Sequence, residues 1–251
     1  MGLGGGVMKI EKFKKLKSGM YELQLDNYEK IFTYEEIILS EELLISKEIT
    51  SLQLKKIEDM NKYYDCYYMT LKIIKRVSKT RYELYMKLKE NYDSEIINKV
   101  LDKLEKQNYI NDSLYANSYL NNQINTTYHG PYRIRKDMEK KGIANDIIND
   151  IMLQYTDDIQ LAKIKKIVNK KITSNHNKSN NALMHKIKSD LQMDGFDLSL
   201  INSVISNISI SDDSEIRERE YNKIKSRLEK KYSGTELEYR IKQKMALKGF
   251  Y

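Results

Sequence analysis

The sequence contains no tryptophan, one proline and one cysteine among its 251 residues. The single cysteine, Cys66, has no partner for a disulfide within the chain, which is typical of a reducing compartment. No apolar run approaches the roughly 20 residues that are needed to cross a bilayer. The glycine-rich residues 1–7 lack the basic stretch that begins a signal peptide. We therefore expect a cytoplasmic protein without a membrane segment, in which residues 1–7 form a flexible extension.

Signatures of catalysis and of metal binding are also missing from the sequence. No glycine-rich loop ends in the Lys-Ser/Thr pair that holds phosphate. His129, His176 and His185 are the only histidines. His185 has no matching ligand at zinc-site spacing, and Cys66 has no neighbouring cysteine. We expect a protein that is not an enzyme and that needs no cofactor or metal, with His176 and His185 at the surface.

The charge balance favours acidic partners. The chain has 44 Lys and Arg residues against 36 Asp and Glu residues, a net charge of +8, and a basic surplus points first to nucleic acid. Because the surplus is small beside the total, it indicates a nucleoprotein partner better than a tight, stand-alone DNA binder. Apolar residues make up 40% and charged residues 32% of the chain, which suits helices with one buried stripe and a wide solvated face.

The N-terminal part of the chain has strand patterns. Met20–Leu25 alternates like a half-buried strand, and Lys30–Tyr34 is a second strand candidate. We expect a small β-hairpin, or a three-strand meander that includes Lys9–Leu16. Such a sheet must pack on other elements because it is marginal alone. A helix is predicted to begin near Thr50, with Gln53 as its capping-box partner.

From about residue 60 onward the periodicity is helical, and one segment recurs. In each copy, two apolar residues lie eight and four positions before a glycine, and an apolar residue follows the glycine. The copies are Ile134, Met138, Gly142 and Ile143; Ile187, Leu191, Gly195 and Phe196; and Ile241, Met245, Gly249 and Phe250. The glycines recur at intervals of 53 and 54 residues. The apolar pair marks the buried face of a helix, which the glycine then ends in the left-handed conformation.

A longer helix is predicted before each segment and a shorter apolar helix after it, so each unit comprises three helices. We therefore predict a mainly α protein, an elongated, curved array of tandem three-helix repeats with a small N-terminal β-hairpin element. The predicted domains are a flexible extension (1–7), a β-hairpin plus helix (8–59), three complete repeats (60–110, 111–156 and 157–209) and a truncated fourth repeat (210–251).

Two segments carry a resemblance to a known family. The first contains a helix end, the turn Asn108-Tyr109-Ile110-Asn111-Asp112, and then Ala116 on the next apolar face. The second, Gly130–Ile143, reads Gly-Pro-Tyr-Arg-Ile-Arg-Lys-Asp-Met-Glu-Lys-Lys-Gly-Ile. Both resemble the RecX family, which has glycine in place of Asn108 and the pattern Gly-x-x-x-Ile-x-x-x-Leu-x-x-Lys-Gly-Ile. Since Asn also tolerates a positive φ, we expect the turn to persist.

The resemblance covers about residues 60–209 and implies a function. Members of the RecX family bind the RecA recombinase and its filament on single-stranded DNA, and they block or modulate RecA activity, filament growth and strand exchange. The resemblance therefore implies RecA and the RecA–single-stranded DNA filament as partners, with DNA itself as a further one. We expect this chain to act as a monomer.

The residues that carry the resemblance are expected to have structural roles. They predict that Asp112 caps the start of the helix that follows it, and they predict a core position at Ala116, a helix start at Gly130, and helix ends at Gly142, Gly195 and Gly249. These residues would mark the family without forming a binding site.

Two clusters of cations are the candidates for contacts with RecA or with DNA phosphates. The first comprises Lys72, Lys75, Arg76, Lys79 and Arg81, around the first predicted inter-helix turn. The second comprises Arg133, Arg135, Lys136, Lys140 and Lys141, on one predicted helix. A solvated face with internal i, i+4 pairs is the simpler interpretation. The functional interpretation is a surface that binds phosphates or RecA carboxylates. On this interpretation, reversing Arg133, Arg135 and Lys136 together to Glu is expected to abolish inhibition of RecA.

Other interpretations stay open at this point. Three-helix units resemble helix-turn-helix domains, so direct DNA binding is the main alternative. Against it, the third helices predicted at 146–154 and 198–207 carry no Lys or Arg. A scaffold for another acidic protein is a third interpretation. The α-helical pattern Tyr63, Tyr64, Tyr67 and Tyr68 is compatible with base stacking, although a core stripe is favoured.

Overall fold

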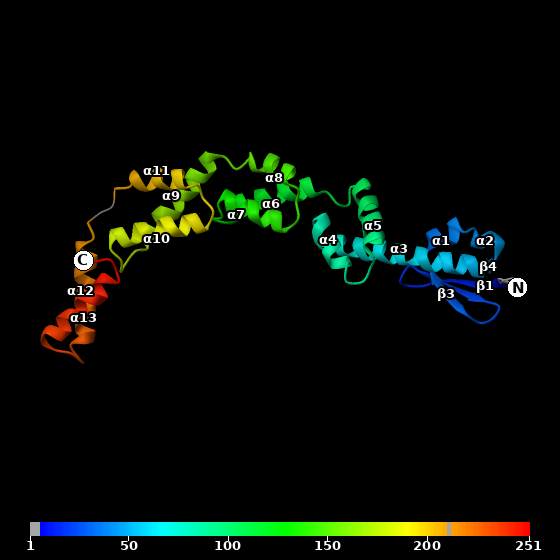
Figure 1. Cartoon of the computed structure of the whole chain (residues 1–251), viewed down its shortest axis with the longest axis horizontal. Coiled ribbons are helices and arrows are strands. Elements are labelled where there is room, and N and C mark those ends of the chain that lie inside the picture. The colour runs from blue at the N-terminus through cyan, green and yellow to red at the C-terminus, as the bar shows by residue number, and fades with distance from the viewer. Residues whose placement is uncertain (1–5, 210–211) are drawn as a thin grey trace. The chain divides into compact units, whose positions relative to one another are not determined.

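The computed structural model describes residues 6–209 and 212–251, which are mainly helical with a small antiparallel sheet at the N-terminal end, as predicted (Figure 1). The chain divides into two compact units, Met1–Asp112 and Ser113–Tyr251. Of the predicted flexible extension, residues 1–5 lie outside the described residues, whereas Val7 begins the first strand. No helix in the described ranges combines the length and the apolar character needed to cross a bilayer.

A four-stranded antiparallel sheet opens the first unit. Its strands are β1 (Val7–Lys15), β2 (Tyr21–Leu25), β3 (Lys30–Thr33) and β4 (Glu48–Thr50), in the order β3-β2-β1-β4. The first three form the predicted meander, so the element is larger than a hairpin. The fourth strand has three residues, too few for an alternating pattern to show in the sequence, and it pairs with β1.

Two short helices, α1 (Glu35–Ser40) and α2 (Leu43–Ser46), add to the core of this sheet. Helices and strands bury their apolar side chains together, and the largest fully buried ones are Leu23, Leu25, Ile37, Leu43, Ile49 and Ile57. Because one core is shared, the N-terminal body does not depend on a marginal sheet alone.

One long helix, α3 (Ser51–Arg76), belongs both to the N-terminal body and to the first repeat. It begins at the predicted capping box, in which Thr50 Oγ1 accepts a hydrogen bond from the Gln53 amide and Gln53 Oε1 accepts one from the Thr50 amide. The predicted boundary between residues 59 and 60 lies inside this helix. Its first half packs on the sheet core and its second half on the core of repeat 1.

Repeat 1 combines the second half of α3 with α4 (Arg81–Leu88) and α5 (Ser94–Lys106). Its buried side chains come from all three helices and include Cys66, Leu84, Leu88, Ile97, Val100, Leu101 and Leu104. Burial raises the pKa of the Cys66 thiol to about 11. The half-buried tyrosines of α3 divide between two cores, with Tyr64 against the sheet core and Tyr63 and Tyr67 against repeat 1.

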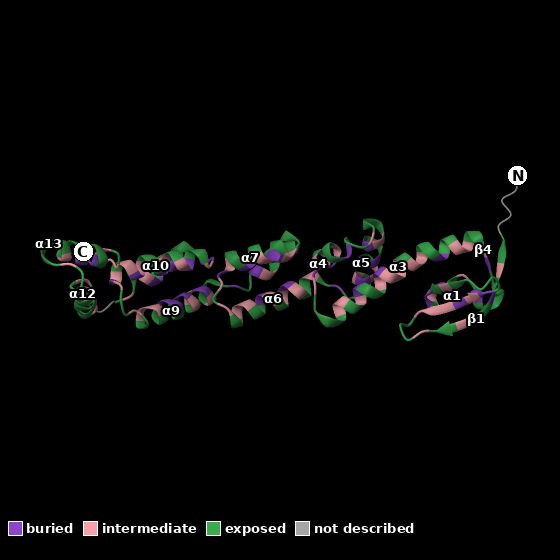
Figure 2. Ribbon diagram, turned by 90° about the horizontal axis from the view of Figure 1, so that it is seen from below, coloured by how far each residue is buried: buried purple, intermediate pink, exposed green. Residues whose placement is uncertain are grey.

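The remaining repeats lie mainly in the second unit. Repeat 2 comprises α6 (Asp112–Thr126), α7 (Pro131–Lys140) and α8 (Asn145–Met152). Repeat 3 comprises α9 (Asp157–Thr173), α10 (Asn180–Met193) and α11 (Leu198–Ser206). Repeat 4 has α12 (Ser214–Leu228) and α13 (Gly234–Ala246) within the described residues. Each repeat has its own cluster of buried side chains, shown in purple in Figure 2.

The recurring glycines adopt the conformation that ends a helix. Gly142, Gly195 and Gly249 have φ values of +70°, +86° and +86°. In each copy, the amide of the following apolar residue donates to the carbonyl five residues back, at 3.1 to 3.2 Å, which satisfies a free carbonyl at the helix end. Asn108 has φ of +59°, so this side chain is tolerated where the family has glycine.

Candidate partner-binding surfaces

Three cations of the first cluster, Lys72, Lys75 and Arg76, are exposed on the last turns of α3. Their spacing of i, i+3 and i+4 places them on one side of the helix. In the part of the chain that the structure describes, none of them has a carboxylate within ion-pair distance. Lys75 and Arg76 also complement the negative end of the helix dipole. These three residues, the α3 cation face, are available to an acidic partner.

The other two cations of the first cluster are engaged within the first unit. Arg81 forms ion pairs with Asp102 and Glu105 of α5, both at 2.8 Å, and so ties α4 to α5. Lys79 lies 3.5 Å from Glu83, a residue of the α4 capping box. Both cations are partly buried, which points to a structural role for them.

Most cations of the second cluster make contacts within repeat 2. Arg135 donates to Asn149 of α8 at 2.8 Å. Lys136 lies 4.9 Å from the centre of the Tyr132 ring. Lys140 is 3.8 Å from Asp137, and its side chain remains 76% exposed. Lys141 lies over the stacked rings of Tyr115 and Tyr119. Lys136 and Lys140 are therefore the members of this cluster that are most accessible to a partner.

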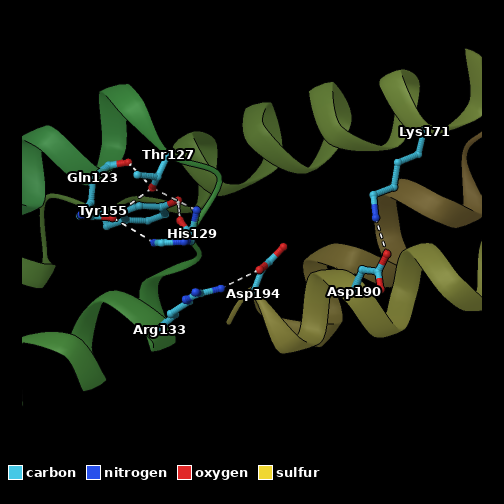
Figure 3. A network of polar contacts seen from close by, with 8 residues as sticks. All are labelled: Gln123, Thr127, His129, Arg133, Tyr155, Lys171, Asp190 and Asp194. Atoms are coloured by element: carbon cyan, nitrogen blue, oxygen red, sulfur yellow. Dashed lines mark hydrogen bonds and ion pairs between the residues drawn. The ribbon is translucent and has the colours of Figure 1, made fainter. Parts of the chain in front are cut away.

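Arg133, the remaining member, joins repeat 2 to repeat 3 (Figure 3). Its Nη1 donates to Asp194 Oδ1 at 3.0 Å. Beside this ion pair, the amides of Gly130 and Tyr132 donate to the carbonyls of Asp194 and Gly195 at 2.7 and 3.1 Å. The backbones are so close that a Cβ on Gly195 would lie 2.5 Å from the Arg133 nitrogen. Gly195 thus ends α10, and because it has no side chain, the start of α7 can pack directly against its backbone.

A similar junction joins repeat 3 to repeat 4. The Ser179 amide donates to the Lys248 carbonyl at 3.0 Å, and a Cβ on Gly249 would lie 2.6 Å from Ala182 Cβ. The Lys248 side chain pairs with the buried Glu220 at 2.7 Å, and this hydrogen bond lowers the pKa of Glu220. Sequence reasoning assigned these glycines only to helix ends, because the contact partners lie in another repeat.

A polar network lies next to the first of these junctions (Figure 3). His129 Nδ1 is 3.0 Å from Gln123 Oε1, and the Tyr155 hydroxyl donates to the His129 carbonyl at 3.0 Å. Burial, and then the positive charge of Arg133, lower the pKa of His129 below its ordinary value. The imidazole is therefore neutral near pH 7, with the proton on Nδ1, because that nitrogen faces an acceptor.

Asp112 caps a different helix from the predicted one. It lies in the first turn of α6, and its carboxylate accepts from the Arg81 amide at 2.9 Å, at the start of α4. Asp213 does the same for the Asn180 amide at the start of α10, at 2.7 Å. The equivalent residue of α7 is Pro131, which has no amide hydrogen to donate. An aspartate at the start of one repeat thus caps the second helix of the repeat before it.

Sequence reasoning missed one aromatic and basic surface in the second unit. Tyr128, which is 42% exposed, has the ammonium groups of Lys166 and Lys170 at 6.0 and 5.9 Å from its ring centre. The neighbouring Lys163 is different, since it donates to the carbonyls of Gln123 and Thr127 at the end of α6. The i, i+4 spacing of Lys166 and Lys170 was a visible signal, but their approach to Tyr128 needed the fold.

Comparison with known proteins gives the family. A family model for the second three-helix domain of RecX matches residues 111–152. The regulatory protein RecX of Streptococcus agalactiae serotype III is 31% identical over 253 residues, covering 97% of this chain and 95% of the relative. The chain belongs to the RecX family. The regulatory protein RecX of Oceanobacillus iheyensis is 26% identical over 200 residues, covering 77% of this chain and 73% of the relative.

Solved structures of RecX agree with this assignment. A crystal structure of regulatory protein RecX has a TM-score of 0.71 and 27% identity, covering 80% of this chain and 100% of that one. The crystal structure of RecX from Lactobacillus salivarius has a TM-score of 0.55 and 29% identity, covering 59% of this chain and 96% of that one. Within residues 6–209 and 212–251, no group of His, Cys, Asp or Glu side chains is arranged to hold a metal ion.

The residues of the RecX resemblance hold the repeats together. Ala116 is fully buried in the repeat 2 core, Asp112 caps α4, and Gly130 and Gly195 form a junction. The partner-binding candidates are therefore other residues: the α3 cation face, Lys136 with Lys140, and Tyr128 with its two lysines.

Proposed function

We propose that this chain is a non-enzymatic regulator of the RecA recombinase. It binds RecA and its filament on single-stranded DNA, and it inhibits or modulates RecA ATP hydrolysis, strand exchange and filament growth. It acts in the cytoplasm as a monomer. The observation that carries the proposal is the match over nearly the whole length of the chain to proteins named regulatory protein RecX.

The distribution of cations supports a binding mode with many weak contacts. The exposed cations are spread over several repeats, on α3, α7 and α9. Contacts of several linked repeats with successive RecA protomers, or with phosphates between them, add through effective concentration. Since each phosphate or carboxylate contact is electrostatic, inhibition is expected to weaken as the salt concentration rises.

The test follows ATP hydrolysis by preformed RecA filaments while the purified chain is added. Inhibition well below one chain per RecA protomer supports action on the filament, because each bound chain then affects many protomers. No inhibition at any ratio contradicts the proposal.

Direct DNA binding is the second candidate, and the surface of Tyr128, Lys166 and Lys170 favours it. An exposed ring beside two cations suits base stacking and phosphate contact on a single strand. Inhibition that only follows the occupancy of bare single-stranded DNA would support this candidate over filament binding.

A further inference from the structure

A pocket of about 630 Å³ lies in the first unit, between the turn after β1, the start of α1 and the middle of α3. Three tyrosines from separate parts of the chain line it. Tyr34 precedes α1, Tyr68 lies on α3, and Tyr92 lies in the loop between α4 and α5. A hollow that combines aromatic rings with a few polar groups is the usual form of a small-ligand site.

Two of the rings form a wall that is partly open to a ligand. Tyr34 and Tyr68 stack with their ring centres 5.0 Å apart and their planes 20° from parallel. Tyr34 is 9% exposed, whereas Tyr68 is 39% exposed. The Tyr68 hydroxyl donates to Glu36, which fixes the position of the ring. A flat ligand can therefore add to this stack at Tyr68.

Asp65 gives the pocket a carboxylate with unused acceptor capacity. One of its oxygens accepts a hydrogen bond from the Tyr34 hydroxyl. Burial and this hydrogen bond raise the pKa of Tyr34, so the hydroxyl keeps its proton and remains the donor. Among residues 6–209 and 212–251, no second donor and no cation lies within bonding distance of the Asp65 side chain. Because a carboxylate has about four acceptor positions, Asp65 can accept two parallel N–H donors from a ligand.

The two cations of the pocket differ in their pairing. Lys15 lies 3.3 Å from Glu35, which balances its charge. Lys72 belongs to the α3 cation face and has no such carboxylate in the described ranges. It follows Asp65 by seven residues, which is about 10.5 Å along a helix, and Tyr68 lies between them. The pocket thus has an acceptor at one end, an unpaired cation at the other and an aromatic ring between them.

A guanine nucleotide fits these three features together. Guanine has two adjacent N–H donors on its Watson–Crick edge, which can pair with the two oxygens of one carboxylate. Its flat ring can stack on tyrosine, and its phosphate suits an ammonium group. Uracil and thymine fit less well, because their one N–H lies between two carbonyl oxygens that a carboxylate repels. A cationic side chain is disfavoured by the like charge of Lys72.

We propose that this pocket binds a guanine nucleotide, whose base stacks on Tyr68 and donates to Asp65 and whose phosphate contacts Lys72. The nucleotide is either free or an unpaired residue of a single strand, since both present the same base and phosphate. The pocket residues all belong to the first unit, whereas Tyr128 and its lysines belong to the second. The proposal does not rest on regulation of RecA.

The test displaces a ribose-labelled fluorescent GTP from the full 251-residue chain. Saturable binding of the label is expected, and unlabelled GTP is expected to displace it at a concentration about tenfold lower than UTP, because only guanine offers the paired donors. Asp65→Asn keeps an acceptor for Tyr34 but turns an amide donor towards guanine, so it is expected to remove the preference. Lys72→Gln is expected to weaken GTP and UTP about equally, since both carry the same phosphates.

Asp59→Asn is the matched control for Asp65→Asn. Asp59 is an exposed carboxylate on the same helix and lies outside this pocket, so the variant is expected to keep the preference for GTP. Circular dichroism shows whether each variant keeps the fold. The comparison of GTP with UTP on the wild-type chain does not depend on any variant.

An all-thymidine oligonucleotide, with and without one central guanine, separates the two sources of the nucleotide. Tighter binding of the guanine-containing strand than of GTP makes an unpaired strand the ligand, and the reverse order makes the free nucleotide the ligand.

Four outcomes would overturn the proposal. Three are no saturable binding of labelled GTP to the folded chain, equal displacement by GTP and UTP, and an unchanged preference in Asp65→Asn. The fourth is binding of a short fluorescent peptide with a single arginine that Asp65→Asn abolishes, because the pocket would then hold a cationic side chain.

Discussion

A position can require glycine for two separate reasons: a positive φ, or the close approach of another backbone segment. Gly195 and Gly234 both have positive φ, +86° and +58°. A Cβ on Gly195 would meet the backbone of Arg133, whereas a Cβ on Gly234 would meet nothing within 4 Å. The first residue serves a junction between repeats, and the second serves only its local turn.

Gly195→Ala is therefore expected to destabilise the chain more than Gly234→Ala. Left-handed backbone costs alanine roughly 1–2 kcal/mol at either site, and the clash at Gly195 adds roughly 1–3 kcal/mol. Urea unfolding of the two variants measures the difference. Equal losses of unfolding free energy would show that the junction does not need the close approach.

His129 makes the stability of the second unit sensitive to mild acid. Its pKa is lowered in the folded chain by burial and by Arg133, so the unfolded chain takes up a proton first as the pH falls below about 6.5. The contribution of the neutral His129 imidazole to the unfolding free energy is complete above this pH. It is lost as the pH falls through the folded-state pKa of His129.

We expect the melting temperature to drop between about pH 7.5 and about pH 5.5, and to drop less in His129→Gln. His176→Gln is the matched control, because His176 is an exposed histidine of the same unit. An identical pH dependence in the wild-type chain and in His129→Gln would rule out His129 as the source.

At the scale of elements, local signals could be predicted and contacts between repeats could not. The capping box of Thr50 and Gln53 and the helix end at Gly142 depend on residues within a few positions. Arg133 and Asp194 are 61 residues apart. A single sequence does not show which residues meet over such a distance, so Arg133 was predicted as a surface cation although it joins two repeats.

The cap on α4 gives a prediction at this scale. Asp112→Ala is expected to lower the unfolding free energy by about 1 kcal/mol, because the Arg81 amide loses its acceptor. Asp112→Asn keeps an acceptor oxygen and is expected to lose less. Amide hydrogen exchange at Arg81 reports the cap directly, and unchanged exchange in Asp112→Ala would contradict this role.

At the scale of the whole molecule, the structure changes which cations are suited to a functional test. Reversal of Arg133 would break a junction between repeats as well as any partner contact. The α3 cation face avoids this problem, since Lys72, Lys75 and Arg76 are exposed and are not engaged in such a junction within the described residues.

The triple variant Lys72→Glu, Lys75→Glu and Arg76→Glu is expected to weaken inhibition of RecA by at least about tenfold without lowering the melting temperature by more than a few degrees. The control triple Lys12→Glu, Lys14→Glu and Lys17→Glu makes the same change in net charge at exposed sites of the same unit. Equal inhibition by both triples would remove the α3 cation face from the binding surface.

Cosedimentation with RecA filaments tests the regulatory role most directly. The chain is mixed with filaments that are held on single-stranded DNA by a non-hydrolysable ATP analogue, and in parallel with the same DNA without RecA. We predict that the chain sediments with the filaments at concentrations where bare DNA retains little of it. Equal retention by bare DNA, or no retention by filaments, would contradict regulation through the RecA filament.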